Sequence, residues 1–159
     1  MKQILFLIFY ALFFLTSCAS CGKKNDLKPG TSDIVNHNDP DTTKNKMKIK
    51  IGSSTFTATL YDNNTVVAFK SLLPLTVNMV ELNGNEKYID LSRSLPTNTL
   101  NPGTIQAGDL MIYGSSTLVL FYKTFSTSYS YTRLGKIDDI TGLAAAVGSG
   151  NVTVIFQLQ

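Results

Sequence analysis

The amino-acid sequence predicts a mainly β protein, with about eight strands closed into a barrel and two short helices. Three observations lead to this fold class. Apolar and polar residues alternate with period two through most of residues 47–159, glycine and asparagine turns separate the alternating segments, and only two segments change to helical spacing. A closed barrel leaves no strand edge exposed, which favours it over an open sheet.

The first residues form a separate region. Lys2 precedes an unbroken apolar run, Ile4–Leu15, which is too short to span a bilayer as a permanent helix. We therefore expect residues 1–17 to be a lipoprotein signal peptide. The run ends in Leu15-Thr16-Ser17-Cys18, which resembles the bacterial lipobox and predicts lipidation of Cys18. In the alternative, the signal is cleaved without lipidation.

Residues 18–46 combine the lipidated cysteine with a polar segment that contains few large apolar residues, so we expect a disordered tether. Ala19 in place of an acidic residue resembles the sorting pattern for the outer membrane, on its periplasmic side. No cysteine follows Cys21, so the domain has no internal disulfide, and the role of Cys21 stays open. The net charge is only +3, with no basic cluster, so nucleic acid is not an expected partner.

The domain, residues 47–159, begins with a predicted hairpin. Lys48–Ile51 alternates, residues 52–54 form a turn, and Phe56, Ala58 and Leu60 share one face of the returning strand.

Two further hairpins follow, one joining 77–81 to 87–91 and one joining 110–113 to 118–122. The last is apolar on both faces, which predicts burial on both sides.

Between these hairpins lies the first predicted helix. Asn63 or Asn64 caps it, and Val66, Phe69 and Leu73 recur at helical spacing until Pro74 stops it.

The second predicted helix lies near the carboxyl end. We expect Asp138, Asp139 or Thr141 to cap its amino end and Gly148 to end it. Its apolar face contains Ile140, Leu143, Ala144 and Val147.

Few catalytic chemistries fit this composition. The only histidine is His37, in the predicted tether, and the domain has no cysteine. Ser–His–Asp and Cys–His catalysis and ordinary zinc sites are therefore excluded, and we predict no catalytic residue, metal ligand or cofactor. Glu81 and Glu86 flank a hairpin turn and are expected to be solvated.

Three segments carry a resemblance to a known family. Gly103–Gly114, Leu118–Tyr122 and Leu134–Ile137, in this order, resemble the bacterial cyclophilin-like family. The resemblance covers residues 47–159 and implies the cyclophilin barrel of eight strands with two helices. Cyclophilins isomerise X-Pro bonds with an arginine in a Phe-x-Arg strand motif, beside a histidine and a tryptophan. Here tryptophan is absent, and Arg93 and Arg133 lie outside such a motif.

The stretch 123–139 alternates tyrosines with hydroxyl residues, so that Tyr129 and Tyr131 would share one face of a strand. The resemblance places Tyr131 where cyclophilins have their histidine, on the face that binds peptide. We therefore predict a ligand-binding surface made by Phe121, Tyr122, Tyr129 and Tyr131. In the alternative, these rings only seal the rim of the barrel.

Together, these patterns predict a membrane-anchored envelope lipoprotein whose cyclophilin-like barrel binds a small molecule or peptide without covalent catalysis. Two alternatives stay open. One is a weak or specialised prolyl isomerase, and the other is a structural or assembly subunit of an envelope complex. The oligomeric state is left open.

Overall fold

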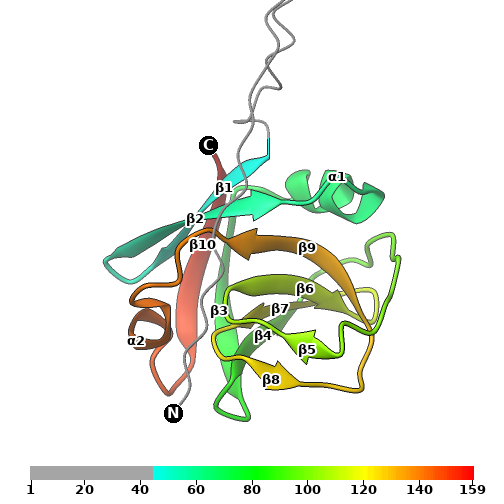
Figure 1. Cartoon of the computed structure of the whole chain (residues 1–159). Helices are drawn as coiled ribbons and strands as arrows, with labels where there is room; N and C mark the ends of the chain where they lie inside the picture. Colours follow the sequence, from blue (N-terminus) through cyan, green and yellow to red (C-terminus); the bar gives the residue numbers. More distant parts are fainter. Residues whose placement is uncertain (1–44) are drawn as a thin grey trace, which may run out of the picture. The chain divides into compact units, whose positions relative to one another are not determined.

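The computed structural model describes residues 45–159. The predicted signal peptide, Cys18 and nearly all of the predicted tether lie outside the described residues. In the described part, eight antiparallel strands close into a barrel in the order β1-β10-β3-β4-β7-β6-β9-β2 (Figure 1). The predicted mainly β fold with a closed barrel and two short helices is confirmed.

In chain order the elements are β1 (Lys46–Ile51), β2 (Ser54–Leu60), α1 (Asn64–Lys70), β3 (Leu75–Leu82), β4 (Glu86–Asp90), β5 (Thr104–Ile105), β6 (Asp109–Tyr113), β7 (Thr117–Phe121), β8 (Phe125–Ser126), β9 (Tyr131–Ile137), α2 (Leu143–Val147) and β10 (Val152–Leu158). The three predicted hairpins are β1–β2, β3–β4 and β6–β7. The two-residue strands β5 and β8 pair with each other outside the barrel.

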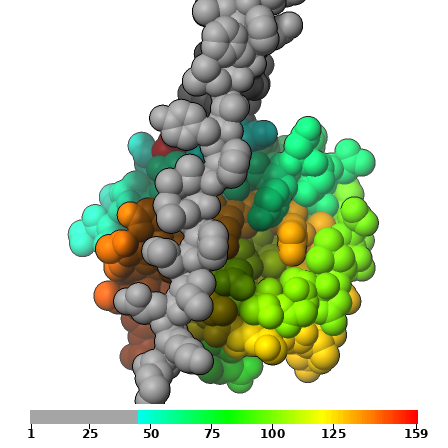
Figure 2. All heavy atoms as spheres, in the orientation of Figure 1, coloured from blue at the N-terminus to red at the C-terminus, as the bar shows by residue number. Residues whose placement is uncertain are grey.

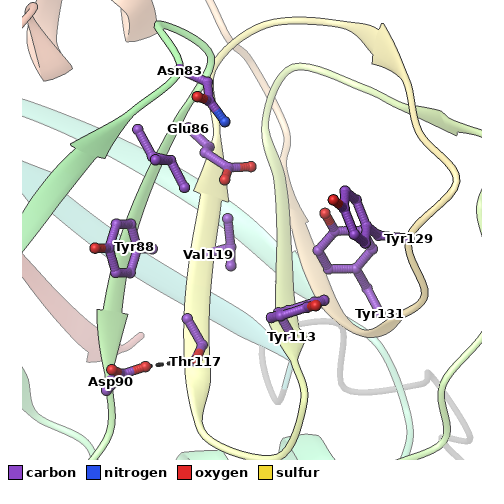
Figure 3. A pocket seen from close by; sticks show the side chains of 10 residues that line it. Asn83, Glu86, Tyr88, Asp90, Tyr113, Thr117, Val119, Tyr129 and Tyr131 are labelled. Atoms are coloured by element: carbon purple, nitrogen blue, oxygen red, sulfur yellow. Dashed lines mark hydrogen bonds between the residues drawn. The ribbon is translucent and has the colours of Figure 1, made fainter.

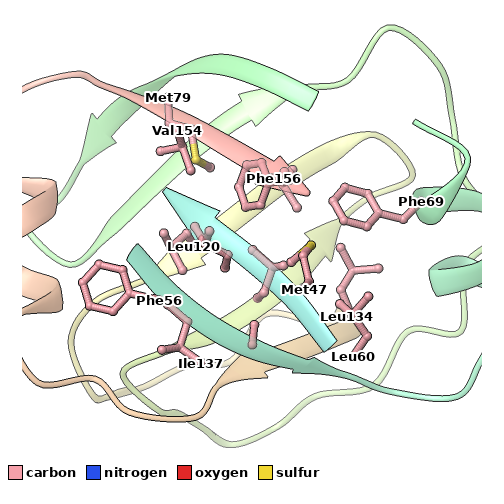
Figure 4. Packing of buried hydrophobic residues seen from close by; sticks show 14 of the residues in the cluster. Met47, Phe56, Leu60, Phe69, Met79, Leu120, Leu134, Ile137, Val154 and Phe156 are labelled. Atoms are coloured by element: carbon pink, nitrogen blue, oxygen red, sulfur yellow. The ribbon is translucent and has the colours of Figure 1, made fainter. Parts of the chain in front are cut away.

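Side chains that point inward fill the barrel (Figure 4). Phe56, Ala58 and Leu60 of β2 are all buried, as their alternation predicts. Phe69 of α1 meets Phe156 of β10 edge to face, with ring centroids 6.2 Å apart, so the helix contributes to the same core.

A second, smaller cluster lies on the outer face of β6 and β7. Met111, Val119 and Phe121 point outward and pack with Ile105 and Tyr131. The β5–β8 pair covers this cluster, because Ile105 of β5 and Phe125 of β8 pack against it. In Figure 2 the segment near residue 100, in bright green, lies next to the segment near residue 125, in yellow, on the surface of the barrel. This cover explains why β6 and β7 are apolar on both faces.

Helix α1 follows its prediction closely. The side chain of Asn63 accepts a hydrogen bond from the backbone N–H of Val66 (2.9 Å), which is the expected cap. Val66 and Phe69 are buried. The helix ends at Lys70, one turn before Pro74, so Leu73 lies beyond it and not on its apolar face as predicted.

The predicted side-chain cap of α2 is wrong. The helix begins at Leu143 after Gly142, whose φ of 80° suits glycine and which provides no side-chain hydrogen bond. Asp138 instead binds Lys46 (2.9 Å) and Thr59 (2.6 Å), and Asp139 accepts the backbone N–H of Thr141 (2.9 Å).

Of the other predictions for this helix, some are confirmed and some are wrong. Ile140 lies before the helix and is exposed, and Ala144 is exposed as well, contrary to their predicted place on the apolar face. Leu143 and Val147 are buried, and Gly148 ends the helix as expected.

Strand β9 passes very close to β2. A Cβ atom added at Gly135 would lie 2.6 Å from the carbonyl oxygen of Thr59, which leaves no room for any other residue. The barrel therefore requires glycine here for closure between these two strands.

Candidate ligand-binding site

A pocket of about 420 Å³ opens on the outer face of the barrel, beside the small outer cluster (Figure 3). It lies over β4, β7 and β6 and reaches the start of β9. Its lining consists of Leu82, Asn83, Glu86, Tyr88, Asp90, Tyr113, Thr117, Val119, Tyr129 and Tyr131. A volume of this size is in the range of small-molecule sites.

Strand register assembles the pocket from residues far apart in the sequence. Asp90 lies opposite Thr117, Thr117 opposite Tyr113, and Tyr113 opposite Tyr131, which forms one row across four strands. Outward positions alternate along each strand, so Tyr88 and Val119 form the adjacent row. Most of the pocket lining therefore belongs to the barrel wall, and Asn83 and Tyr129 add to it from the neighbouring loops.

The tyrosine rings form one wall. The ring centroid of Tyr113 lies 6.0 Å from that of Tyr129 and 5.6 Å from that of Tyr131. Tyr131 is nearly buried because its ring stands edge-on against Phe121, with centroids 5.5 Å apart. Tyr129 is 61% exposed, so its ring is the accessible end of this wall.

Two carboxylates line the pocket. Asp90 accepts a hydrogen bond from the hydroxyl of Thr117 (2.6 Å). Glu86 lies nearer the β3–β4 turn, and in Figure 3 its carboxylate projects over β7 toward Tyr129 and Tyr131. Partial burial, and then the charge of Glu81, raise the pKa of Glu86. Burial, followed by the charge of Glu86, also raises the pKa of Tyr131.

The pocket lining combines polar and aromatic side chains. Its lining has hydroxyls, rings and carboxylates but no Lys, Arg or His. Residues 45–159 contain no group of three or more His, Cys, Asp or Glu side chains arranged to hold a metal ion. Neither helix of the described part is long and apolar enough to cross a membrane.

Comparison with known proteins agrees with this architecture. The model of the cyclophilin-like family matches residues 49–157. The chain belongs to the cyclophilin-like family. The solution structure of a hypothetical protein from Archaeoglobus fulgidus is similar, with a TM-score of 0.51 and 16% identity over 76% of this chain and 99% of that one. At this identity the likeness concerns the fold alone. No curated protein matches the chain.

The cyclophilin-like barrel places the four predicted site residues in three different environments. Tyr129 and Tyr131 line the pocket together. Tyr129 was expected to lie in the same strand as Tyr131, but β9 begins only at Tyr131 and Tyr129 precedes it. Phe121 is fully buried beneath Tyr131 and supports the wall from below.

Tyr122 does not line this pocket. Its neighbour Phe121 points to the outer face of the barrel, so Tyr122 points to the interior. Its hydroxyl donates to the carboxylate of Glu81 (2.9 Å to Oε2), beside the buried ammonium of Lys87. Burial, followed by this hydrogen bond, raises the pKa of Tyr122 to about 12. The expectation that Glu81 is solvated is wrong, because its side chain is only 19% exposed and binds Lys87 and Tyr122.

The sequence reasoning missed most of the lining. Glu86 is half-buried in the pocket wall and not solvated as predicted, and Tyr88, Asp90 and Tyr113 are lining residues that the sequence does not single out. One signal was present: Glu86, Tyr88 and Asp90 alternate with Lys87 and Ile89, which places all three on one face of a strand.

Proposed function

We propose that this cyclophilin-like domain binds a small molecule or peptide in the tyrosine-lined pocket and performs no covalent catalysis. The observation that carries the proposal is the pocket itself, in which Tyr88, Tyr113 and Tyr131 of the barrel strands and Tyr129 just before β9 surround a volume of about 420 Å³. Tyrosine rings provide contact area with few rotatable bonds, and their hydroxyls orient a ligand.

A prolyl isomerase needs a positioned donor at the twisting amide, because the barrier is about 18–20 kcal/mol. The lining of this pocket has no arginine, lysine or histidine to serve as that donor. Tyrosine and threonine hydroxyls are weaker donors. Binding without efficient isomerisation is therefore the function that the site supports best.

We further propose that the domain is held at the cell envelope by a lipid on Cys18, with the barrel facing the periplasm. Support comes from the apolar run that ends in Leu15-Thr16-Ser17-Cys18. Stable attachment needs more than one acyl chain, which the bacterial modification provides.

The test combines a binding screen with an isomerase assay on the full chain in a non-ionic detergent. A cocktail of neutral, anionic and cationic small molecules and proline-containing tetrapeptides is screened by saturation-transfer NMR. We expect at least one ligand class to bind and to lose affinity in Tyr129→Ala, whose exposed ring can be removed without disturbing the core.

The matched control is Tyr61→Ala, which removes another exposed tyrosine outside the lining. The proline peptides should isomerise at the uncatalysed rate, with a time constant of about 10–100 s. Fast isomerisation by the wild type, or the absence of any binding in the screen, would overturn the proposal.

A further inference from the structure

The pocket has charge of one sign. Glu86 and Asp90 are its two acidic residues, and no basic side chain belongs to the lining. Arg133 lies on β9 two residues beyond Tyr131, yet it is outside the lining. A ligand that enters therefore meets negative charge with no counter-charge from the pocket wall.

Glu86 differs from the other acidic residues around it. Asp90 accepts a hydrogen bond from Thr117, and Glu81 accepts hydrogen bonds from Lys87 and Tyr122. Within residues 45–159, the carboxylate of Glu86 has neither a hydrogen bond nor an ion pair. It is half-buried, so it has lost part of its hydration without gaining a partner, which is an unfavourable state for a carboxylate.

The rings around Glu86 have the complementary property. Tyr88 stands on one side of β7, and Tyr113, Tyr129 and Tyr131 stand on the other (Figure 3). The faces of aromatic rings carry partial negative charge and attract ammonium and guanidinium groups, most strongly where water is excluded. A cation beside Glu86 would therefore contact a full negative charge and aromatic rings together.

We propose that the pocket selects a compact organic cation, an alkylammonium or guanidinium group, which pairs with Glu86 among the tyrosine rings. This inference rests on the proposed function, since it names the ligand class of the same pocket. The cation belongs to a free small molecule or to a lysine or arginine side chain of a peptide, because the recognised group is the same in both. An organic cation fits better than a metal ion because the lining provides ring faces and separated carboxylates.

The experiment measures charge selectivity with matched pairs of probes on the full chain. Choline is compared with dimethylbutanol, its neutral isostere in which carbon replaces nitrogen. A second pair compares acetyl-Gly-Arg-Gly-amide with the same peptide containing citrulline, which is neutral. Affinities come from titration followed by NMR. The variants are Glu86→Gln and, as a matched control, Asp62→Asn, which neutralises an exposed carboxylate outside the pocket.

At least one cation should bind about tenfold or more tightly than its neutral partner. Glu86→Gln should remove about fivefold or more of that preference and leave the neutral probe unchanged, whereas Asp62→Asn should change neither. A preference limited to choline identifies a free small molecule as the source, and one limited to the arginine peptide identifies a side chain.

Two results separate failure of this inference from failure of the proposed function. If the cation and its neutral isostere bind equally well and Tyr129→Ala weakens both, the pocket binds ligands but the cation inference is wrong. If no cationic, neutral or anionic compound in either experiment binds, both proposals are wrong. As a control, each variant should unfold at the same temperature as the wild type, which would show that a loss of affinity is not caused by a loss of folding.

Discussion

The ammonium group of Lys87 lies fully buried in the barrel and donates a hydrogen bond to the carboxylate of Glu81 on the neighbouring strand. The same ammonium donates to the carbonyl oxygens of Gly148 (2.9 Å) and Gly150 (2.6 Å), in the loop after α2. Tyr122, which directly follows β7, also donates a hydrogen bond to Glu81. All three ammonium hydrogens thus have partners, and they join β3 and β4 to the loop before β10.

Replacing Lys87 with Met should destabilise the domain strongly. The change removes the Lys87 donor from two carbonyl groups and from the Glu81 carboxylate, which keeps Tyr122, at a cost of about 2–4 kcal/mol in the free energy of unfolding. Urea unfolding measures this, with Lys48→Met as the control because Lys48 is exposed on β1. Equal stabilities of the two variants would show that the buried ammonium makes no net contribution.

The stability of the domain should fall in acid partly through Glu81. Desolvation alone raises the pKa of Glu81, but hydrogen bonds from Lys87 and Tyr122 outweigh it, so the pKa lies below 4.5. A lowered folded-state pKa means that ionised Glu81 stabilises the fold above pH 4.5 and that this contribution disappears as the pH falls below 4.5.

Glu81→Gln should therefore lose less stability than the wild type over that acid range. Asp138, whose pKa is lowered by Thr59 and Lys46 against desolvation, has the same sign, and Glu86, whose pKa is raised, has the opposite sign. Both are present in the two proteins, and the charge of Glu81 contributes to the raised pKa of Glu86, so the difference between the unfolding curves reports Glu81 together with its effect on Glu86. Parallel curves would contradict the role given to this carboxylate.

Gly135→Ala should disturb the closure of the barrel. The new Cβ would lie 2.6 Å from the backbone oxygen of Thr59, which cannot move without shifting β2. We expect a loss of about 1–3 kcal/mol in the free energy of unfolding. Gly150→Ala is the control, since nothing lies within 4 Å of its Cβ position.

Affinity for an organic cation should depend on pH through Glu86. Burial and then the charge of Glu81 raise the pKa of Glu86, so on acidification its carboxylate loses its charge at a higher pH than an ordinary glutamate does. Choline should bind more weakly as the pH falls, while Glu86→Gln should show a smaller change. The other titratable groups facing the pocket, Asp90 and the tyrosines, are common to both proteins.

Cys18→Ser should move the protein from the membrane to the soluble fraction, because the serine hydroxyl does not accept the lipid. Fractionation of cells, followed by immunoblotting, measures the distribution. Cys21→Ser is the matched control and should remain in the membrane. Unchanged retention of Cys18→Ser would exclude lipidation at this residue as the anchor.

Local patterns predicted the elements of this fold well. The hairpins and α1 depend on alternation, turn residues and the Asn63 cap, all of which lie within a few residues of one another. The predicted cap of α2 was wrong because the Asp138 carboxylate binds Lys46, which is 92 residues away in the sequence. A carboxylate near the start of a helix can cap that helix or pair with a distant side chain, and which of the two occurs depends on the folded barrel.

The pocket was harder to predict because it depends on which strands become neighbours. β4 pairs with β7 across an intervening segment, which brings Glu86 beside Phe121 and Asp90 beside Thr117. Tyr129 and Tyr131, two residues apart in the chain, both line the pocket. Phe121 and Tyr122 could not both belong with them, since consecutive strand residues face opposite sides of the wall.

Alternation along the strands makes this domain a scaffold for engineering. In β6 and β7, Ile112 and Leu118 hold the interior, while their chain neighbours Tyr113 and Thr117 line the pocket. The exposed lining positions can therefore be randomised in a library while every interior residue is kept. Mutation and selection can therefore change the shape and charge of the pocket separately from the stability of the barrel, and related chains can diverge at this surface while they keep one fold.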